Sequence, residues 1–159
     1  MVLMHSTANA DIVLEVGATF IDGESTDSAT IILQKRWQDR FVLGLGYLSA
    51  QYVDTCGRPD CEWDISSQWM VGGEYMLSWR RVSFGVGLYY VENLSRITSS
   101  YLNVRSSLEF AITQRFAVKY SHISNGGIGK TITICNDFYC LPSGKYNLGV
   151  DAILLVWQF

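Results

Sequence analysis

The sequence has little charge, few histidines and no long apolar run. Aspartate, glutamate, lysine and arginine make up only 17% of the 159 residues, against about 25% in typical soluble domains. Hydrophobic residues reach 48% and aromatic residues 13%, which excludes an intrinsically disordered chain. No apolar stretch approaches the roughly 18 residues of a transmembrane helix. The formal net charge of −3 and the isoelectric point of about 5.3 argue against nucleic-acid binding.

The four cysteines form two pairs of equal spacing, Cys56 with Cys61 and Cys135 with Cys140. Neither histidine lies beside a pair, and the spacing is wider than in the usual zinc motifs, so no metal site is predicted. Both pairs lie among turn-forming residues. We interpret them as loop disulfides formed in an oxidising compartment, with four free thiols in a cytosolic protein as the alternative. Four cysteines allow three connectivities, so the pairing is left open.

The remaining chain has a hydrophobic period of two residues, which predicts strands rather than helices. About eight such segments occur, each near the ~9–11 residues that a tilted strand needs to cross a bilayer. We expect the fourth to run from Ile65 to Leu77. Short connections after Trp37, Leu77 and Ile112 alternate with long ones. This pattern predicts an all-β fold, an eight-stranded antiparallel up-and-down transmembrane β-barrel.

The two faces of the predicted strands identify the kind of barrel. One stripe is large, apolar and aromatic, whereas the other is small or polar. A soluble lipocalin-like barrel would place apolar residues inside. An eight-stranded barrel has room inside only for side chains, so three acids and three bases can pair there, whereas on the lipid side each charge would be costly. We therefore predict that the lumen holds the ionic stripe, which contains Glu15, Arg36, Gln68, Glu74, Arg105, Glu109 and Lys119.

The sequences at the two ends of the chain bear on whether the protein is secreted and on where it resides in the cell. Residues 1–10 end in Ala8-Asn9-Ala10, which resembles the end of a secretory signal, although the basic and long apolar regions of a signal are missing. We predict a leader or signal remnant at 1–10 and one barrel domain at 11–159. The last segment alternates up to Trp157 and Phe159 and resembles the C-terminal strand of bacterial outer-membrane barrels. We therefore expect the bacterial outer membrane.

Three polar residues interrupt the stripe assigned to lipid. His122 and Ser124 share a face because they are two residues apart on one strand, and counting back by two from Phe159 places Asp151 on the same face of the next strand. Pairing His122 with Asp151 centres the connecting hairpin between residues 136 and 137, within one residue of the centre of the Cys135–Cys140 pair. Polar residues in a lipid-facing stripe indicate a functional site.

Serine, histidine and an acid on one surface can form a hydrolytic triad. The histidine removes the proton of the serine hydroxyl, and the acid orients the imidazole and stabilises its cation. Backbone N–H groups of Asn125, Gly126 and Gly127 lie where an oxyanion could develop. A histidine in the interfacial belt of the membrane, without catalytic function, is the alternative interpretation.

These residues carry a family resemblance. The stretch His122-Ile123-Ser124-Asn125-Gly126-Gly127, followed by Asn147-Leu148-Gly149-Val150-Asp151 and a terminal strand, resembles the lipid A 3-O-deacylases of the PagL type, which are eight-stranded outer-membrane barrels. The resemblance implies Ser124 as nucleophile and His122 as base. Asp151 falls where the family places an orienting glutamate, and Asn125, Gly126, Gly127 and Asn147 match positions around its oxyanion site. The acid is one methylene shorter than in the family, and the segment 128–146 is longer.

The leading hypothesis is an outer-membrane esterase that hydrolyses the 3-O-linked acyl chain of lipid A and releases a 3-hydroxy fatty acid, with its active site at the outer leaflet. Lipopolysaccharide is the expected partner, together with outer-membrane lipids, for a monomer or homodimer. No cofactor and no metal are implied. The alternatives are a non-enzymatic barrel with disulfide-closed binding loops, a phospholipase on the same scaffold, and a soluble barrel with an apolar ligand inside.

Overall fold

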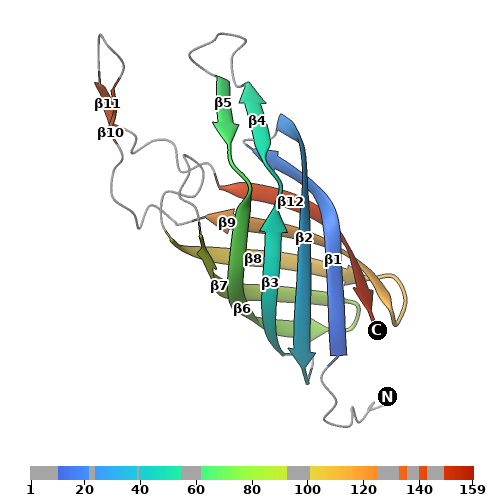
Figure 1. Ribbon diagram of the computed structural model, residues 1–159. Coiled ribbons are helices and arrows are strands. Elements are labelled where there is room, and N and C mark those ends of the chain that lie inside the picture. Colours follow the sequence, from blue (N-terminus) through green and yellow to red (C-terminus); the bar gives the residue numbers. More distant parts are fainter. Residues whose placement is uncertain are drawn as a thin grey trace.

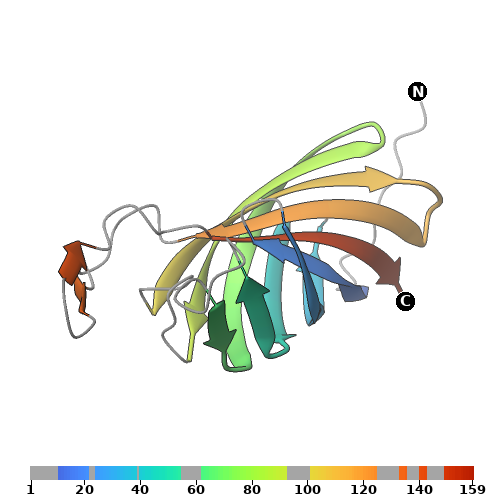
Figure 2. The same cartoon turned by 90° about the horizontal axis from the view of Figure 1, so that it is seen from above.

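Eight strands close into one antiparallel barrel in the order β1-β12-β9-β8-β7-β6-β3-β2 (Figures 1 and 2). The computed structural model describes residues 11–21, 24–38, 40–54, 62–92, 101–124, 133–135, 140–142 and 149–159. Within these ranges no helix is long and apolar enough to cross a membrane. The prediction of an eight-stranded antiparallel barrel is confirmed. The barrel strands are β1 (Asp11–Ile21), β2 (Glu24–Trp37), β3 (Phe41–Leu48), β6 (Gln68–Trp79), β7 (Val82–Val91), β8 (Leu102–Ala111), β9 (Phe116–Ser124) and β12 (Val150–Gln158).

Two small hairpins lie outside the barrel, within the long connections. One pairs β4 (Gln51–Asp54) with β5 (Glu62–Ile65), and the other pairs β10 (Thr133–Cys135) with β11 (Cys140–Pro142). In Figure 1 both hairpins lie beyond the end of the barrel opposite the two termini. Cys135 and Cys140 are partners across the second hairpin, whereas Cys56 and Cys61 lie outside the described residues, and both disulfides stay predictions.

The expectation that Ile65 begins the fourth barrel strand was wrong. Ile65 pairs with Gln51 in the first small hairpin, and β6 begins at Gln68. Ser66 and Ser67, which are not in a strand, separate the two elements. The separation was hidden in the sequence because Ile65 and Trp69 are four residues apart, so the period-two alternation continues in phase across it.

Burial alternates along the barrel strands as the sequence predicted. In β3, the exposed fractions are 59% for Leu43 and 53% for Leu45, whereas that of Val42, the residue before Leu43, is 2%. At the C-terminal strand the ring of Trp157 stacks on Phe116 and on Phe159 across the outer surface, with centroids 5.5 and 4.9 Å apart. The large apolar stripe therefore faces outward, as the membrane-spanning surface of such a barrel requires.

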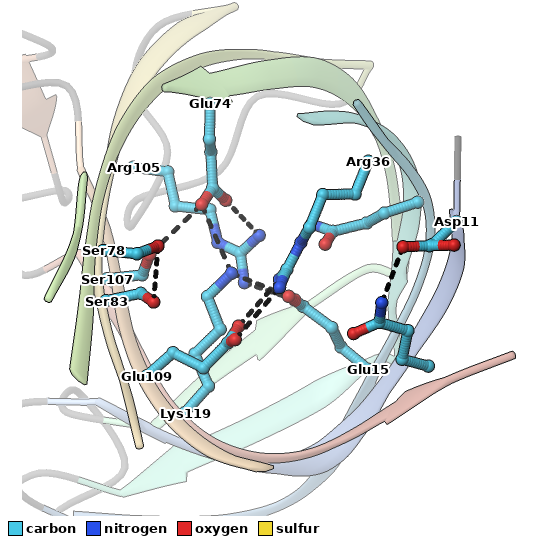
Figure 3. Close-up of polar contacts among 12 residues, drawn as sticks. Asp11, Glu15, Arg36, Glu74, Ser78, Ser83, Arg105, Ser107, Glu109 and Lys119 are labelled. Atoms are coloured by element: carbon cyan, nitrogen blue, oxygen red, sulfur yellow. Dashed lines mark hydrogen bonds and ion pairs between the residues drawn. The ribbon is translucent and has the colours of Figure 1, made fainter. Parts of the chain in front are cut away.

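The centre of the lumen holds a fully buried cluster of four charged side chains (Figure 3). The guanidinium of Arg105 donates to Glu15 at 2.6 Å and also donates to Glu74. The ammonium of Lys119 donates to the same two carboxylates, at 2.7 and 3.2 Å. We call these four residues the lumen cluster. Each charge in it has opposite charges as partners, which is the condition for burying an ion inside a protein.

The rest of the lumen is filled on both sides of this cluster. Toward the short turns, Arg36 donates two hydrogen bonds to Glu109, at 3.1 and 2.8 Å. The three acids and three bases predicted for the lumen are therefore all paired. Toward the long connections lies an apolar layer that includes Ile32, Leu48, Met70, Tyr89, Val91, Ile123 and Val150. The barrel interior is thus a packed core, as expected for eight strands.

Candidate active site

A histidine and an aspartate are paired on the outer surface, near the end of the barrel that carries the long connections. Asp151 of β12 is the direct cross-strand partner of His122 of β9. The Nδ1 atom of His122 lies 2.8 Å from Oδ1 of Asp151, and the two side chains are 35% and 24% exposed. The register predicted by counting along the two strands is therefore confirmed, and aspartate is long enough to reach the imidazole.

Gly149 determines the space beside the imidazole. It precedes β12 and has a φ of +66°, in the left-handed region that glycine adopts without steric cost. A Cβ atom at this position would lie 2.7 Å from Cε1 and 3.1 Å from Nε2 of His122. Because such a Cβ would also lie 2.8 Å from the backbone oxygen of Ile123, any larger residue would require the imidazole or the backbone to shift. The lack of a side chain at Gly149 thus leaves room for the imidazole on this side.

Ser124 ends β9, two residues beyond His122, and is half-buried on the same outward face. Because Ile123 pairs with Val150, the next row of the sheet brings Ser124 and Gly149 to the same level. The Nε2 atom of His122 lies beside Gly149. The ring nitrogen that does not contact Asp151 is therefore on the side of the histidine where Ser124 lies.

Tyr120 is a third partner in the pair, which sequence reasoning missed. Its hydroxyl donates to Oδ1 of Asp151 at 2.5 Å, the same oxygen that contacts His122. The signal was present in the register: Tyr120 lies two residues before His122 and is a diagonal neighbour of Asp151, within reach of a long side chain. Tyr120 precedes His122 on β9, so it contacts the carboxylate from the side of the short turns, away from Ser124.

Ser106 was also missed. It is the direct partner of His122 on the other neighbouring strand, β8, and is half-buried on the outward face. Ser106, His122 and Asp151 therefore form one row across three strands. The turn between β8 and β9 is centred on Gln114, in the middle of the turn expected from the sequence, so counting outward from it would have found this pair.

The predicted oxyanion residues Asn125, Gly126, Gly127 and Asn147 lie outside the described residues, and their role stays a prediction. Within the described ranges no group of three or more His, Cys, Asp and Glu side chains is placed to hold a metal ion. The described arrangement is a carboxylate–imidazole pair with one hydroxyl in the same row and another in the next. Such a set can move a proton from a hydroxyl to an imidazole.

Comparisons with known proteins give the fold. No protein-family model matches the chain, and no curated protein matches it. Among solved structures, the chain is similar to the outer membrane enzyme PagL, with 17% identity, coverage of 94% of this chain and 99% of that one, and a TM-score of 0.53. The outer membrane protein Ail of Yersinia pestis is 11% identical, with 95% and 100% covered and a TM-score of 0.49. The PagL comparison supports the same barrel architecture.

Proposed function

We propose that this protein is an outer-membrane esterase that hydrolyses the 3-O-linked acyl chain of lipid A. The observation that carries the proposal is the hydrogen-bonded pair of His122 and Asp151 on the outer surface of the barrel. Most outward positions of the barrel strands are apolar, and polar groups facing lipid are costly unless they serve a function. A paired imidazole and carboxylate at this place favours catalysis on a lipid over a structural role.

Ser124 is the proposed nucleophile because it lies on the same outward face of β9 as His122, two residues further along the strand. Asp151 accepts a hydrogen bond from Nδ1–H of His122, which leaves Nε2 as the base. Nε2 takes the proton of the Ser124 hydroxyl as its oxygen attacks the carbonyl carbon of the ester. The imidazolium then returns the proton to the departing sugar oxygen, and an acyl-enzyme remains. Water, activated by the same imidazole, releases the fatty acid and restores Ser124.

The position of the pair favours a substrate in the outer leaflet. The pair lies near the end of the barrel with the long connections, which face outward in outer-membrane barrels. Its surface faces the bilayer and not the lumen, so the ester comes from a membrane lipid. Lipid A is proposed because the residues around Ser124 and Asp151 resemble the PagL-type deacylases, and the PagL structure has the same architecture.

The test compares two variants, each of which removes one serine hydroxyl near His122. Ser124 lies on the same strand as His122, and Ser106 lies opposite it on β8. Detergent-folded protein is incubated with purified lipopolysaccharide, and the lipid A products are weighed by mass spectrometry. The unaltered protein is expected to remove one 3-hydroxyacyl chain. Ser124→Ala is expected to abolish nearly all release, and Ser106→Ala, which removes the other neighbouring hydroxyl, to retain most of it.

The same experiment separates the alternatives. If Ser106→Ala abolishes release and Ser124→Ala does not, the nucleophile is misassigned. If phospholipids lose an acyl chain and lipid A does not, the enzyme is a phospholipase. If neither lipid changes with the folded protein, the barrel is not an esterase, and its long connections become the candidate functional surface.

A further inference from the structure

The two ends of the barrel carry opposite charge, which the net charge of −3 conceals. The long connections, taken by sequence as residues 22–27, 49–67, 92–101 and 125–149, contain nine acidic and four basic residues. The three short turns, 38–40, 80–81 and 112–115, contain four arginines and one aspartate. The lumen cluster between the two ends has two acids and two bases.

The arginines of the short turns are all exposed. They are Arg40, Arg80, Arg81 and Arg115, one or two in each turn, so they are distributed around the rim. None of them contributes to the paired lumen charges. Their positive charge is therefore available to molecules that surround this end of the barrel.

Tryptophans at the same end indicate the depth of these arginines. Trp79 ends β6 and is 72% exposed, and the guanidinium carbon of Arg80 lies 5.0 Å from the centre of its ring. Lys35 lies over Trp37 in the same way, at 5.3 Å. Exposed tryptophans of membrane proteins lie at the level of the lipid headgroups. A cation held on such a ring is at the depth of the headgroup phosphates.

A hollow of about 180 Å³ opens at this end, and its lining includes further hydrogen-bond donors. It is lined by Arg80 and Arg115 together with Ser78, Ser83 and Gln114. Arg36 and Glu109 also line it, but they are paired with each other. Ser78 and Ser83 are hydrogen-bonded to each other at 2.9 Å, so the guanidinium groups of Arg80 and Arg115 are the donors that suit an anion with several oxygen acceptors, such as a phosphodiester.

We propose that the short-turn rim binds anionic phospholipid headgroups, and that it thereby selects phospholipids such as phosphatidylglycerol over zwitterionic ones. The proposal rests on the membrane location given under the proposed function, but it does not depend on esterase activity. Basic residues at a membrane surface attract anionic lipids through charge. The long connections, which are acidic in sequence, are not expected to attract anionic lipids.

The tryptophans allow a measurement confined to one end of the barrel. Of the five, Trp63 and Trp69 lie on β5 and at the start of β6, toward the long connections, whereas Trp37, Trp79 and Trp157 lie toward the short turns. The reporter protein carries Trp63→Phe and Trp69→Phe. It is folded into vesicles of phosphatidylcholine mixed with brominated phosphatidylglycerol or brominated phosphatidylcholine, and fluorescence quenching gives the relative affinity of the two lipids.

The reporter is expected to favour phosphatidylglycerol by roughly fivefold or more in low salt, the factor that one basic residue contributes near an anionic surface. One molar salt should remove most of this preference. Arg80→Gln, Arg81→Gln and Arg115→Gln combined should lower this ratio severalfold, since Arg40 is then the one arginine left on the rim. The control removes three other cations, Arg58→Gln, Arg96→Gln and Lys130→Gln, which lie in the long connections by sequence, and should keep the preference.

Three results would overturn the proposal: equal quenching by both lipids, a triple-arginine variant that keeps the preference, or a control that loses it equally. Failure of the reporter to insert into any vesicle would overturn the membrane location and this proposal with it. A protein that inserts and prefers phosphatidylglycerol, yet releases no fatty acid, would support the rim and reject only the esterase.

Discussion

The lumen cluster and the outward pair place the same chemical groups on opposite faces of one sheet. Inside, Arg105 and Lys119 hold two carboxylates in a closed set, and all four side chains are fully buried. Outside, Asp151 holds one imidazole nitrogen, and the other has no hydrogen-bond partner among the described residues, with both side chains partly exposed. A closed set of ions stabilises a fold or fixes its register, whereas an imidazole with one nitrogen left without a partner can accept a proton. This comparison predicts that substitutions inside change stability and substitutions outside change catalysis.

Within this comparison, the largest effect is expected on kcat when Asp151, the acid of the outward pair, is replaced. Asp151→Asn should lower kcat by a factor on the order of 10⁴, because an amide no longer orients the imidazole or stabilises its cation. Its free energy of unfolding should change by less than about 1 kcal/mol, since the residue is partly exposed. Kinetics on lipopolysaccharide and urea unfolding in detergent measure the two. Asp151→Glu should recover part of the activity, and unchanged kinetics in Asp151→Asn would remove Asp151 from the mechanism.

The opposite result is expected for the lumen cluster. Arg105→Met should lower the free energy of unfolding by about 3–5 kcal/mol, because Glu15 and Glu74 then share Lys119 as their remaining basic partner in the cluster. Lys35→Met, which removes an exposed cation from the outer surface, is the control and should change stability by less than about 0.5 kcal/mol. The rate of hydrolysis per folded molecule should stay the same in both. A normal unfolding curve for Arg105→Met would mean that the cluster contributes little to stability.

A smaller effect on catalysis is expected at Gly149. Gly149→Ala should lower kcat by about 10²-fold, because the added Cβ displaces the imidazole, and a displacement of about 1 Å has this effect. The added strain at a positive φ is about 1–2 kcal/mol. The control is the same substitution in a His122→Ala background, where it should have no further effect on the rate. A full additional loss there would show that Gly149 acts independently of the histidine.

The smallest effect is expected at Tyr120. Tyr120→Phe removes one hydrogen bond to Asp151 and should lower kcat by up to about tenfold, the equivalent of 0.5–1.5 kcal/mol. Tyr90→Phe, another exposed tyrosine on the outer face, should leave the rate unchanged. If Tyr120→Phe has no effect, the carboxylate is held sufficiently by His122 alone.

Much of this comparison could be predicted from the sequence, because a strand has a strict period of two. Once Glu15, Arg105 and Lys119 fall on the stripe opposite the aromatic residues, their place inside follows from the cost of charge in lipid. The pairing of His122 with Asp151 followed from the same counting, although the segment between them is long, because each strand fixes its own phase.

The features that were missed depend on relations that a single strand does not contain. Ser106 meets His122 only through the register between two strands, and Tyr120 reaches Asp151 only on the diagonal. The contact of Gly149 with the imidazole depends on a backbone conformation just before a strand, where periodicity ends. Ile65 was misplaced for the related reason that two elements followed each other in phase.

The lumen cluster also bears on how the barrel reaches the membrane. Glu15 is in the first strand, and its partners Arg105 and Lys119 follow 90 and 104 residues later. An inserted but unclosed sheet would hold an unneutralised carboxylate in a hydrocarbon environment, which is costly. Insertion and closure must therefore proceed together, and an assembly intermediate that carries only the N-terminal half of the barrel must keep its inner face in contact with water or with an assembly factor.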